Sequence, residues 1–148
     1  MEAENFCVAG RLRMLSRIIT SLYNEPFEPE GVTFAQASLL MHVFAQPGIR
    51  QVALSRMLQI EKSALSRDIQ LLQRKGWIAA VNRHGLHLTD EGIQIARRCH
   101  KIWKRLHGQI QEELGQEAIS ALSVFSGQLF RLQEGRKQAV SEPSDTTS

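Results

Sequence analysis

The side chains best suited to chemistry gather in one short stretch in the middle of the chain. Leu65, Ile69 and Leu72 recur there at helical spacing, which predicts a helix with one apolar side. The open side of that helix carries hydroxyl, amide and basic groups, from Lys62, Ser63, Ser66, Arg67 and Gln70. Short hydroxyls allow close approach to base edges, and an arginine can donate two hydrogen bonds to a guanine or bridge phosphates. These groups favour contact with nucleic acid.

A second short amphipathic helix directly precedes this one. It is predicted over residues 51–58, a break of about three residues follows, and the polar helix covers residues 62–75. Gly76 then stands where a helix C-terminal glycine belongs. Two short helices joined in this way are typical of a helix-turn-helix, whose second helix lies in the DNA major groove. At 1.5 Å per residue, the second helix is about 21 Å long, enough to cross a groove about 12 Å wide.

The flanking segments complete a winged helix-turn-helix. Thr33 is predicted to cap a helix over residues 33–46, and short apolar stretches at 78–81 and 86–88 flank NRHG as a two-stranded hairpin. Arg83 and His84 lie at the tip of that hairpin, where a side chain reaches the minor groove or a phosphate. Thr89 is predicted to cap a long helix to about residue 114, which Gly115 separates from a last helix over 116–134.

The chain is therefore predicted to be mainly α-helical, with one domain over residues 1–135. The winged helix-turn-helix covers about residues 33–90, between dimerisation helices at about 5–24 and 90–135. The first of these helices has an apolar face wider than one packing partner usually needs. Residues 136–148 lack apolar periodicity and are predicted to be a disordered tail.

Positive charge is concentrated on the predicted DNA-binding module. The whole chain has a net charge of +3, but residues 50–84 carry seven Lys and Arg against two Asp and Glu, a net of +5. A basic patch confined to one module suits a partner with a phosphate backbone. A solvated helix face would show the same charge, and a winged helix can also serve as a protein-interaction module without DNA binding.

Four segments, in this order, resemble the MarR family of bacterial transcription regulators: CVAGRLRMLSRIITSLYN, GVTFAQASLL, ALSRMLQIEKSALSRDIQLLQRKGWI and LHLTDEG. The resemblance covers about residues 5–135. It implies a homodimer in which each subunit contacts half of a palindromic operator in double-stranded DNA, as a repressor that a small ligand releases. It places the DNA-facing positions at Ser63, Ala64, Ser66 and Arg67, and the wing at residues 82–87. The wing NRHGLH departs from the family pattern, because it keeps one arginine and lacks the aspartate that usually orients it.

Three further features of the sequence bear on ligand, redox or metal chemistry. Cys7 lies near the start of the first helix, where a lowered thiol pKa would make a redox sensor, although a small apolar interface residue fits equally. Arg11 shares the apolar stripe and could hold a small anionic or aromatic ligand, or extend its charge to the rim. The five histidines form no convincing cluster, so no metal site is predicted.

Other classes of function are not favoured. The sequence shows no glycine-rich phosphate loop and no nucleophile elbow, so no enzyme and no cofactor are predicted. Two cysteines are too few for a disulfide framework, and no apolar run is long enough to span a membrane. A cytoplasmic protein is therefore expected.

Overall fold

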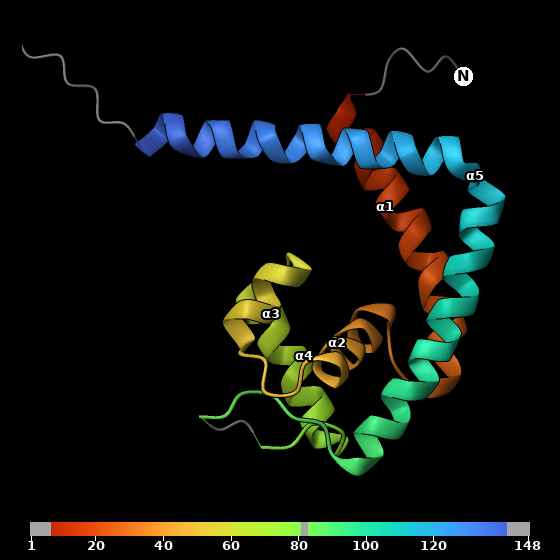
Figure 1. The fold of residues 1–148 in the computed structure, drawn as a ribbon, viewed down its shortest axis with the longest axis vertical. Helices are drawn as coiled ribbons and strands as arrows, with labels where there is room; N and C mark the ends of the chain where they lie inside the picture. Colours follow the sequence, from red (N-terminus) through yellow and green to blue (C-terminus); the bar gives the residue numbers. More distant parts are fainter. Residues whose placement is uncertain (1–6, 81–82, 142–148) are drawn as a thin grey trace, which may run out of the picture. The chain divides into compact units, whose positions relative to one another are not determined.

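The computed structural model describes residues 7–80 and 83–141, and the mainly helical fold class is confirmed. The helices follow one another as α1 (Val8–Asn24), the 3-10 helix η2 (Glu25–Glu30), α2 (Phe34–Ala45), α3 (Gln51–Leu58), α4 (Lys62–Arg74) and α5 (Asp90–Ser141) (Figure 1). The chain divides into two compact units, Met1–Leu106 and His107–Ser148. No helix of the described residues is long and apolar enough to cross a membrane.

The segment NEPFEPEG ends α1, as the two prolines predict, but it also forms a short helix that the sequence did not indicate. In η2, Pro26 occupies the first turn, where the missing N–H of proline costs no hydrogen bond. Phe27 is fully buried, and its ring lies 5.8 Å from that of Phe34 on α2. The segment therefore belongs to the core and is not merely a linker.

The predicted N-cap of α2, Thr33, is confirmed. Thr33 Oγ1 accepts a hydrogen bond from Gln36 N at 3.2 Å, and Thr33 N donates to Gln36 Oε1 at 3.2 Å, which is a complete capping box. Asn24 Oδ1 accepts from Phe34 N at 2.8 Å and joins the end of α1 to the start of α2. Glu61, a poor cap, makes no side-chain capping bond at the start of α4.

One hydrophobic core lies in the first unit, among α2, α3, α4 and the start of α5. It contains Leu65, Ile69 and Leu72, which were predicted to form the apolar side of α4, together with Leu54, Ile95 and Cys99. Each of these side chains is at most 5% exposed. The helical spacing of the α4 residues in the sequence thus predicted correctly that their side chains face the core.

The predicted two-stranded hairpin at 78–81 and 86–88 is confirmed at its base, where Ala79 N donates to His87 O at 2.9 Å, but Leu86 has a different partner. Ile78 pairs with Leu88 in a single bridge, whereas Leu86 pairs with Ile49, in the loop before α3. That pairing needs two backbones in close approach, because a Cβ on Gly85 would lie 2.1 Å from Gly48 O. The wing therefore rests on the α2–α3 loop. Residues 81 and 82, which include part of the predicted strand and wing, lie outside the described residues.

Thr89 begins α5 as expected, since its Oγ1 accepts from Gly92 N at 3.0 Å. Gly115 interrupts the helix with φ 77° and ψ 161°, at the predicted break. The last helix, however, continues to Ser141, so residues 136–141 of the predicted disordered tail are helical. Arg136, Lys137 and Gln138 are good helix formers, and no proline stops them before Pro143. Residues 142–148 lie outside the described part.

Candidate nucleic-acid interface

The turn between α3 and α4 is fixed by one buried hydroxyl. Gln59 adopts the left-handed conformation, with φ 53°, and ends α3. Ser55, only 8% exposed, donates from Oγ to Ile60 O at 2.7 Å, and Ile60 N donates to Ser55 O at 3.1 Å. This reciprocal pair closes the turn, so α4 leaves α3 in a defined direction. Sequence analysis placed the turn but did not single out Ser55.

The structure places most of the predicted DNA-contacting groups together on the open side of α4. Four of them are exposed: Lys62, Ser63, Arg67 and Gln70. Ala64 and Ser66 are partly buried, nearer the core-facing side. Because residues three and four apart share a helix face, Ser63, Arg67 and Gln70 form one stripe. This stripe, together with Lys62, is called the α4 face below.

The acidic residue of α4 is turned toward α2. Gln36 Nε2 donates to Asp68 Oδ1 at 3.1 Å, and both residues are partly buried. A carboxylate held at this side stays off the stripe that carries Arg67. The arrangement leaves the α4 face with basic, hydroxyl and amide groups and without a carboxylate.

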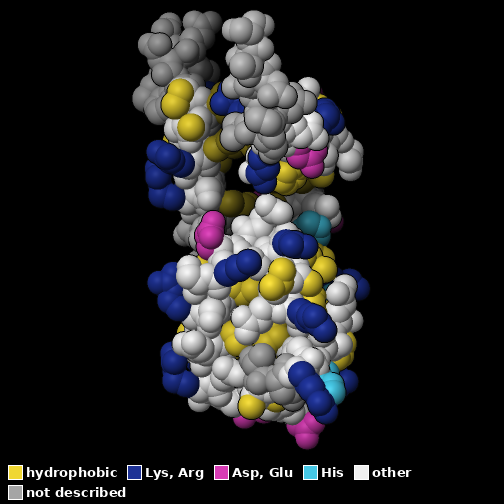
Figure 2. Space-filling view, turned by 90° about the vertical axis from the view of Figure 1, so that its left-hand side faces the viewer, with side chains coloured by type: hydrophobic (Ala, Val, Ile, Leu, Met, Phe, Trp, Pro, Cys, Tyr) yellow, Lys and Arg dark blue, Asp and Glu magenta, His cyan; other side chains and the backbone are white. Residues whose placement is uncertain are grey.

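Further basic residues are exposed on the helix-turn-helix that carries the α4 face. Arg50, Arg56 and Arg74 are exposed on the same helix-turn-helix, and sequence analysis counted their charge without assigning them a site. Lys and Arg side chains predominate over Asp and Glu in the lower part of Figure 2, which views the side where α3, α4 and the wing lie in Figure 1. Because these arginines are exposed, they are further candidates for DNA contact. A count of charges in the sequence does not reveal which side chains are exposed.

Arg83 and His84 of the wing are exposed, and the contacts described for the wing are local. Arg83 Nε donates to His84 Nε2 at 3.3 Å, and His87 Nε2 lies 3.2 Å from His84 O. Both Arg83 and His84 are exposed beside the two-bridge base of the wing. The arrangement presents one guanidinium and two imidazoles at the edge of the module.

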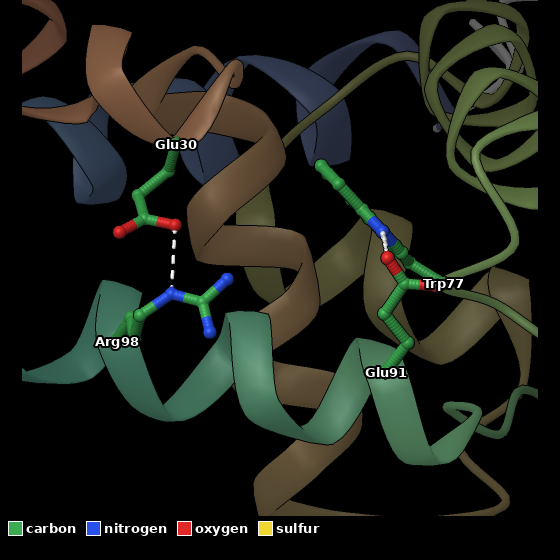
Figure 3. Close-up of polar contacts among 4 residues, drawn as sticks. All are labelled: Glu30, Trp77, Glu91 and Arg98. Carbon is green, nitrogen blue, oxygen red and sulfur yellow. Dashed lines mark hydrogen bonds and ion pairs between the residues drawn. The ribbon is translucent and has the colours of Figure 1, made fainter.

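The C-terminal end of α4 is bound to the segments around it. Lys75 Nζ lies 4.8 Å from the centre of the Trp77 ring and donates to Gly31 O. Trp77 Nε1 donates to Glu91 Oε1 at 3.2 Å, which joins the end of α4 to the start of α5 (Figure 3). Lys75, although basic, is therefore engaged within the fold.

A second contact in Figure 3 joins η2 to α5. Arg98 Nε and Glu30 Oε2 form an ion pair at 2.9 Å, the only one among the described residues. Beside it lies Cys99, whose pKa is raised to about 11, chiefly by burial and also by the Glu30 carboxylate. Cys99 is accordingly a protonated core thiol at neutral pH.

A pocket of about 300 Å³ lies between α2 and the first part of α5. Its lining is mainly apolar and aromatic, with a few polar groups. The lining residues are Phe34, Ser38, Met41, His42, Ala45, His100 and Trp103. His42 Nδ1 lies 2.7 Å from Ser38 O, so this nitrogen carries a proton and the other ring nitrogen is left for a second partner. The rings of His100 and Trp103 stack at 5.7 Å. Sequence analysis missed this site, because its residues are distributed over two distant helices.

The two residues predicted for ligand or redox chemistry lie elsewhere. Cys7 is the exposed N-cap of α1, and its Sγ accepts from Gly10 N at 3.3 Å. Arg11 is exposed on α1, and neither residue lines the pocket. Within residues 7–80 and 83–141, no three His, Cys, Asp or Glu side chains are grouped so that they could hold a metal ion.

The helix order, the turn at Gln59 and the wing at residue 83 together define a winged helix-turn-helix protein. Comparison with known proteins makes this more specific. The family model described as "MarR family" matches residues 30–85, which contain α2, α3, α4 and most of the wing. Over residues 30–85 the chain is therefore similar to the MarR family.

Similar proteins cover most of the chain. The multiple antibiotic resistance protein MarR of Escherichia coli (strain K12) is 28% identical over 121 residues, which are 76% of this chain and 84% of that protein. The structure of a Staphylococcus aureus MepR–DNA complex matches with a TM-score of 0.74 at 20% identity, over 88% of this chain and 99% of that one. The transcriptional repressor CouR bound to p-coumaroyl-CoA also matches with a TM-score of 0.74, at 24% identity, over 84% and 92%. At these identities the two structures show a shared fold.

Proposed function

We propose that this protein is a sequence-specific DNA-binding regulator that acts as a homodimer, a repressor that a small ligand releases. The observation that carries the proposal is the α4 face. Its Lys62, Ser63, Arg67 and Gln70 side chains are exposed on the second helix of a helix-turn-helix, which carries further exposed arginines. These are donors that contact base edges and phosphates in a major groove.

A protein-interaction module is the rival function. Such a module would keep the same core with a surface suited to protein, whose centre is normally depleted of charged groups and enriched in aromatic residues. The α4 face has no aromatic residue, and the one carboxylate within α4, on Asp68, is bound to Gln36. The described groups therefore favour DNA over a protein partner.

Selection from a random library of duplexes tests the DNA proposal. The wild-type protein should enrich one palindromic sequence, called the selected duplex below, and should bind it with an affinity that falls steeply with salt. Fluorescence anisotropy on the selected duplex and a scrambled one, at several salt concentrations, measures both properties. If no duplex is enriched and binding is equal for all sequences, the interaction module becomes the better proposal.

The ligand part of the proposal rests on the pocket. Its size suits a small molecule, and its aromatic floor with Ser38, His42 and His100 suits a small aromatic anion. 1-Naphthoate is a suitable probe, and in wild-type protein it should bind and weaken affinity for the selected duplex. Ala45→Trp, which adds bulk at the pocket lining, should lose the response and keep DNA binding. An equal response in both proteins would place the probe elsewhere.

A further inference from the structure

Gln36 has both ends of its side-chain amide in use. Its Oε1 accepts a hydrogen bond from Thr33 N, and its Nε2 donates to Asp68 Oδ1 at 3.1 Å. Because the capping box fixes which end faces Thr33, the N–H end is directed to α4 by the same geometry. The contact therefore joins α2 to α4 with an orientation that α2 itself sets.

On α4, Asp68 is next to the residue with the greatest capacity for base contact. Arg67 precedes it and is exposed, whereas Ile69 follows it and is 1% exposed in the core. A hydrogen bond at Asp68 therefore acts at the boundary between the packed side of α4 and the α4 face. A rotation or slide of α4 that breaks this bond would also displace Arg67.

The same α2 helix forms one wall of the pocket. Phe34 and Ser38 line the pocket, and each is two positions from Gln36, which places them about 200° around the helix. Figure 1 accordingly shows α2 between α4 and the first part of α5. One face of α2 is thus available to a pocket ligand, while the opposite face holds Asp68.

We propose that Gln36 is a positioning residue for DNA recognition, which sets the place of α4 against α2 through its bond to Asp68. The inference rests on the DNA binding proposed above and adds to it a residue that lies outside the α4 face. Through the same hydrogen bond, a movement of α2 at the pocket would also shift Asp68 and its neighbour Arg67.

Reversing the donor and the acceptor gives a sharp test. Gln36→Glu keeps the capping box, since glutamate also serves at this position, but it turns a carboxylate toward Asp68. Asp68→Asn alone keeps an acceptor for Gln36 and is the matched control for charge. In the double variant, the amide at position 68 donates to the carboxylate at position 36, so the bond returns with its roles exchanged.

We expect Gln36→Glu to lower affinity for the selected duplex about tenfold in the wild-type background, and less than about threefold in the Asp68→Asn background. The added negative charge is the same in both backgrounds, so its general repulsion of DNA cancels in this comparison. On the scrambled duplex the loss should be small and equal in both. Far-UV circular dichroism at the assay temperature checks that all four proteins remain helical.

An equal loss in both backgrounds, or an equal loss on the selected and the scrambled duplex, would overturn the positioning role and leave the proposed function intact. A wild-type protein that prefers no duplex would overturn both. The two failures are thus distinguished by the wild-type protein alone.

Discussion

Arg67 and Lys62 are five positions apart on α4 and should contribute to DNA binding in different ways. Arg67 projects from the second turn, where a side chain in the groove can reach base edges, whereas Lys62 is the first residue of the helix, where phosphates pass. Helical spacing predicted that both side chains face outward, and both are exposed. Their contacts with DNA remain a prediction.

Replacing Arg67 with alanine should cost about 1–3 kcal/mol on the selected duplex and relax its preference at one base pair. Lys62→Ala should weaken binding to all sequences alike and lower the salt slope by about one for each subunit engaged. Arg83→Ala on the wing should resemble Lys62→Ala. Anisotropy titrations at several salt concentrations measure these effects, with Lys104→Ala on α5 as the control for loss of one charge. Unchanged affinity and specificity in Arg67→Ala would mean that α4 is not in the major groove.

The two thiols should differ in reactivity. Burial raises the pKa of Cys99 to about 11, so in the native state this group stays protonated and shielded at pH 8, while Cys7 is exposed. Brief treatment with iodoacetamide should therefore modify Cys7 alone, as mass spectrometry of peptides would show, and Cys99 should react only in denaturant. Early modification of Cys99 in the native protein would contradict its burial.

The same shift has a consequence for stability at high pH. The native pKa of Cys99 lies above the unfolded value of 9.0, so its contribution is fully present below pH 9 and is lost as pH rises toward 11. Urea unfolding of the wild type and of Cys99→Ala at several pH values would measure this. The difference between the two proteins in free energy of unfolding should shrink across that window.

A redox function for Cys7 is the alternative that remains to be tested. Cys7→Ser should bind the selected duplex as tightly as the wild type, because the residue lies on α1, far along the chain from α4. We expect peroxide to release both proteins equally. Selective resistance of Cys7→Ser to peroxide would instead assign a sensing role to this thiol.

At the scale of single elements, the helices were predictable because their signals are local. The residues that begin and end α2, α3 and α4 lie within a few positions of these helices, so the sequence predicted Thr33, Gly76 and the break after α3. The pairing of Leu86 in the wing was not predictable, because its partner, Ile49, lies in a different loop. Likewise, the bond from Gln36 to Asp68 joins positions 32 apart, and no local pattern indicates it.

Ser55 should matter more for the turn than its small size suggests. Ser55→Ala removes the donor to Ile60 O and leaves that carbonyl without this bond, which should lower the free energy of unfolding by about 1–2 kcal/mol. Urea unfolding measures the loss, and Ser63→Ala, exposed on the α4 face, is the matched control with little expected effect on stability. Equal stability in all three proteins would show that the hydroxyl does not hold the turn.

At the scale of the whole molecule, both units carry large apolar side chains that are exposed to solvent. No residue of α1 is buried, and Leu15, Ile18 and Leu22 are each about half exposed. In the second unit, Leu122 and Phe130 are more than half exposed. Exposed apolar surface of this kind is typical of a protein interface, and a second copy of the chain is the partner that the family resemblance implies.

Ile18→Glu should therefore weaken the proposed dimer, because it places a charge in the apolar stripe of α1. Light scattering should show a shift toward monomer or aggregate at concentrations where the wild type is dimeric. Ser16→Glu adds the same charge two positions away and should leave the dimer unchanged. A soluble dimer in both variants would remove α1 from the interface.

The two tryptophans occupy different parts of the first unit, so each can serve as an intrinsic fluorescence probe of its own surroundings. Trp103 lines the pocket, while Trp77 lies beneath Lys75 and donates to Glu91 where α4 meets α5. With Trp77 replaced by phenylalanine, the remaining emission should follow the pocket. With Trp103 replaced, it should follow the C-terminal end of α4. Occupancy by a small molecule and engagement with DNA could then be recorded as two separate fluorescence signals, without any attached dye.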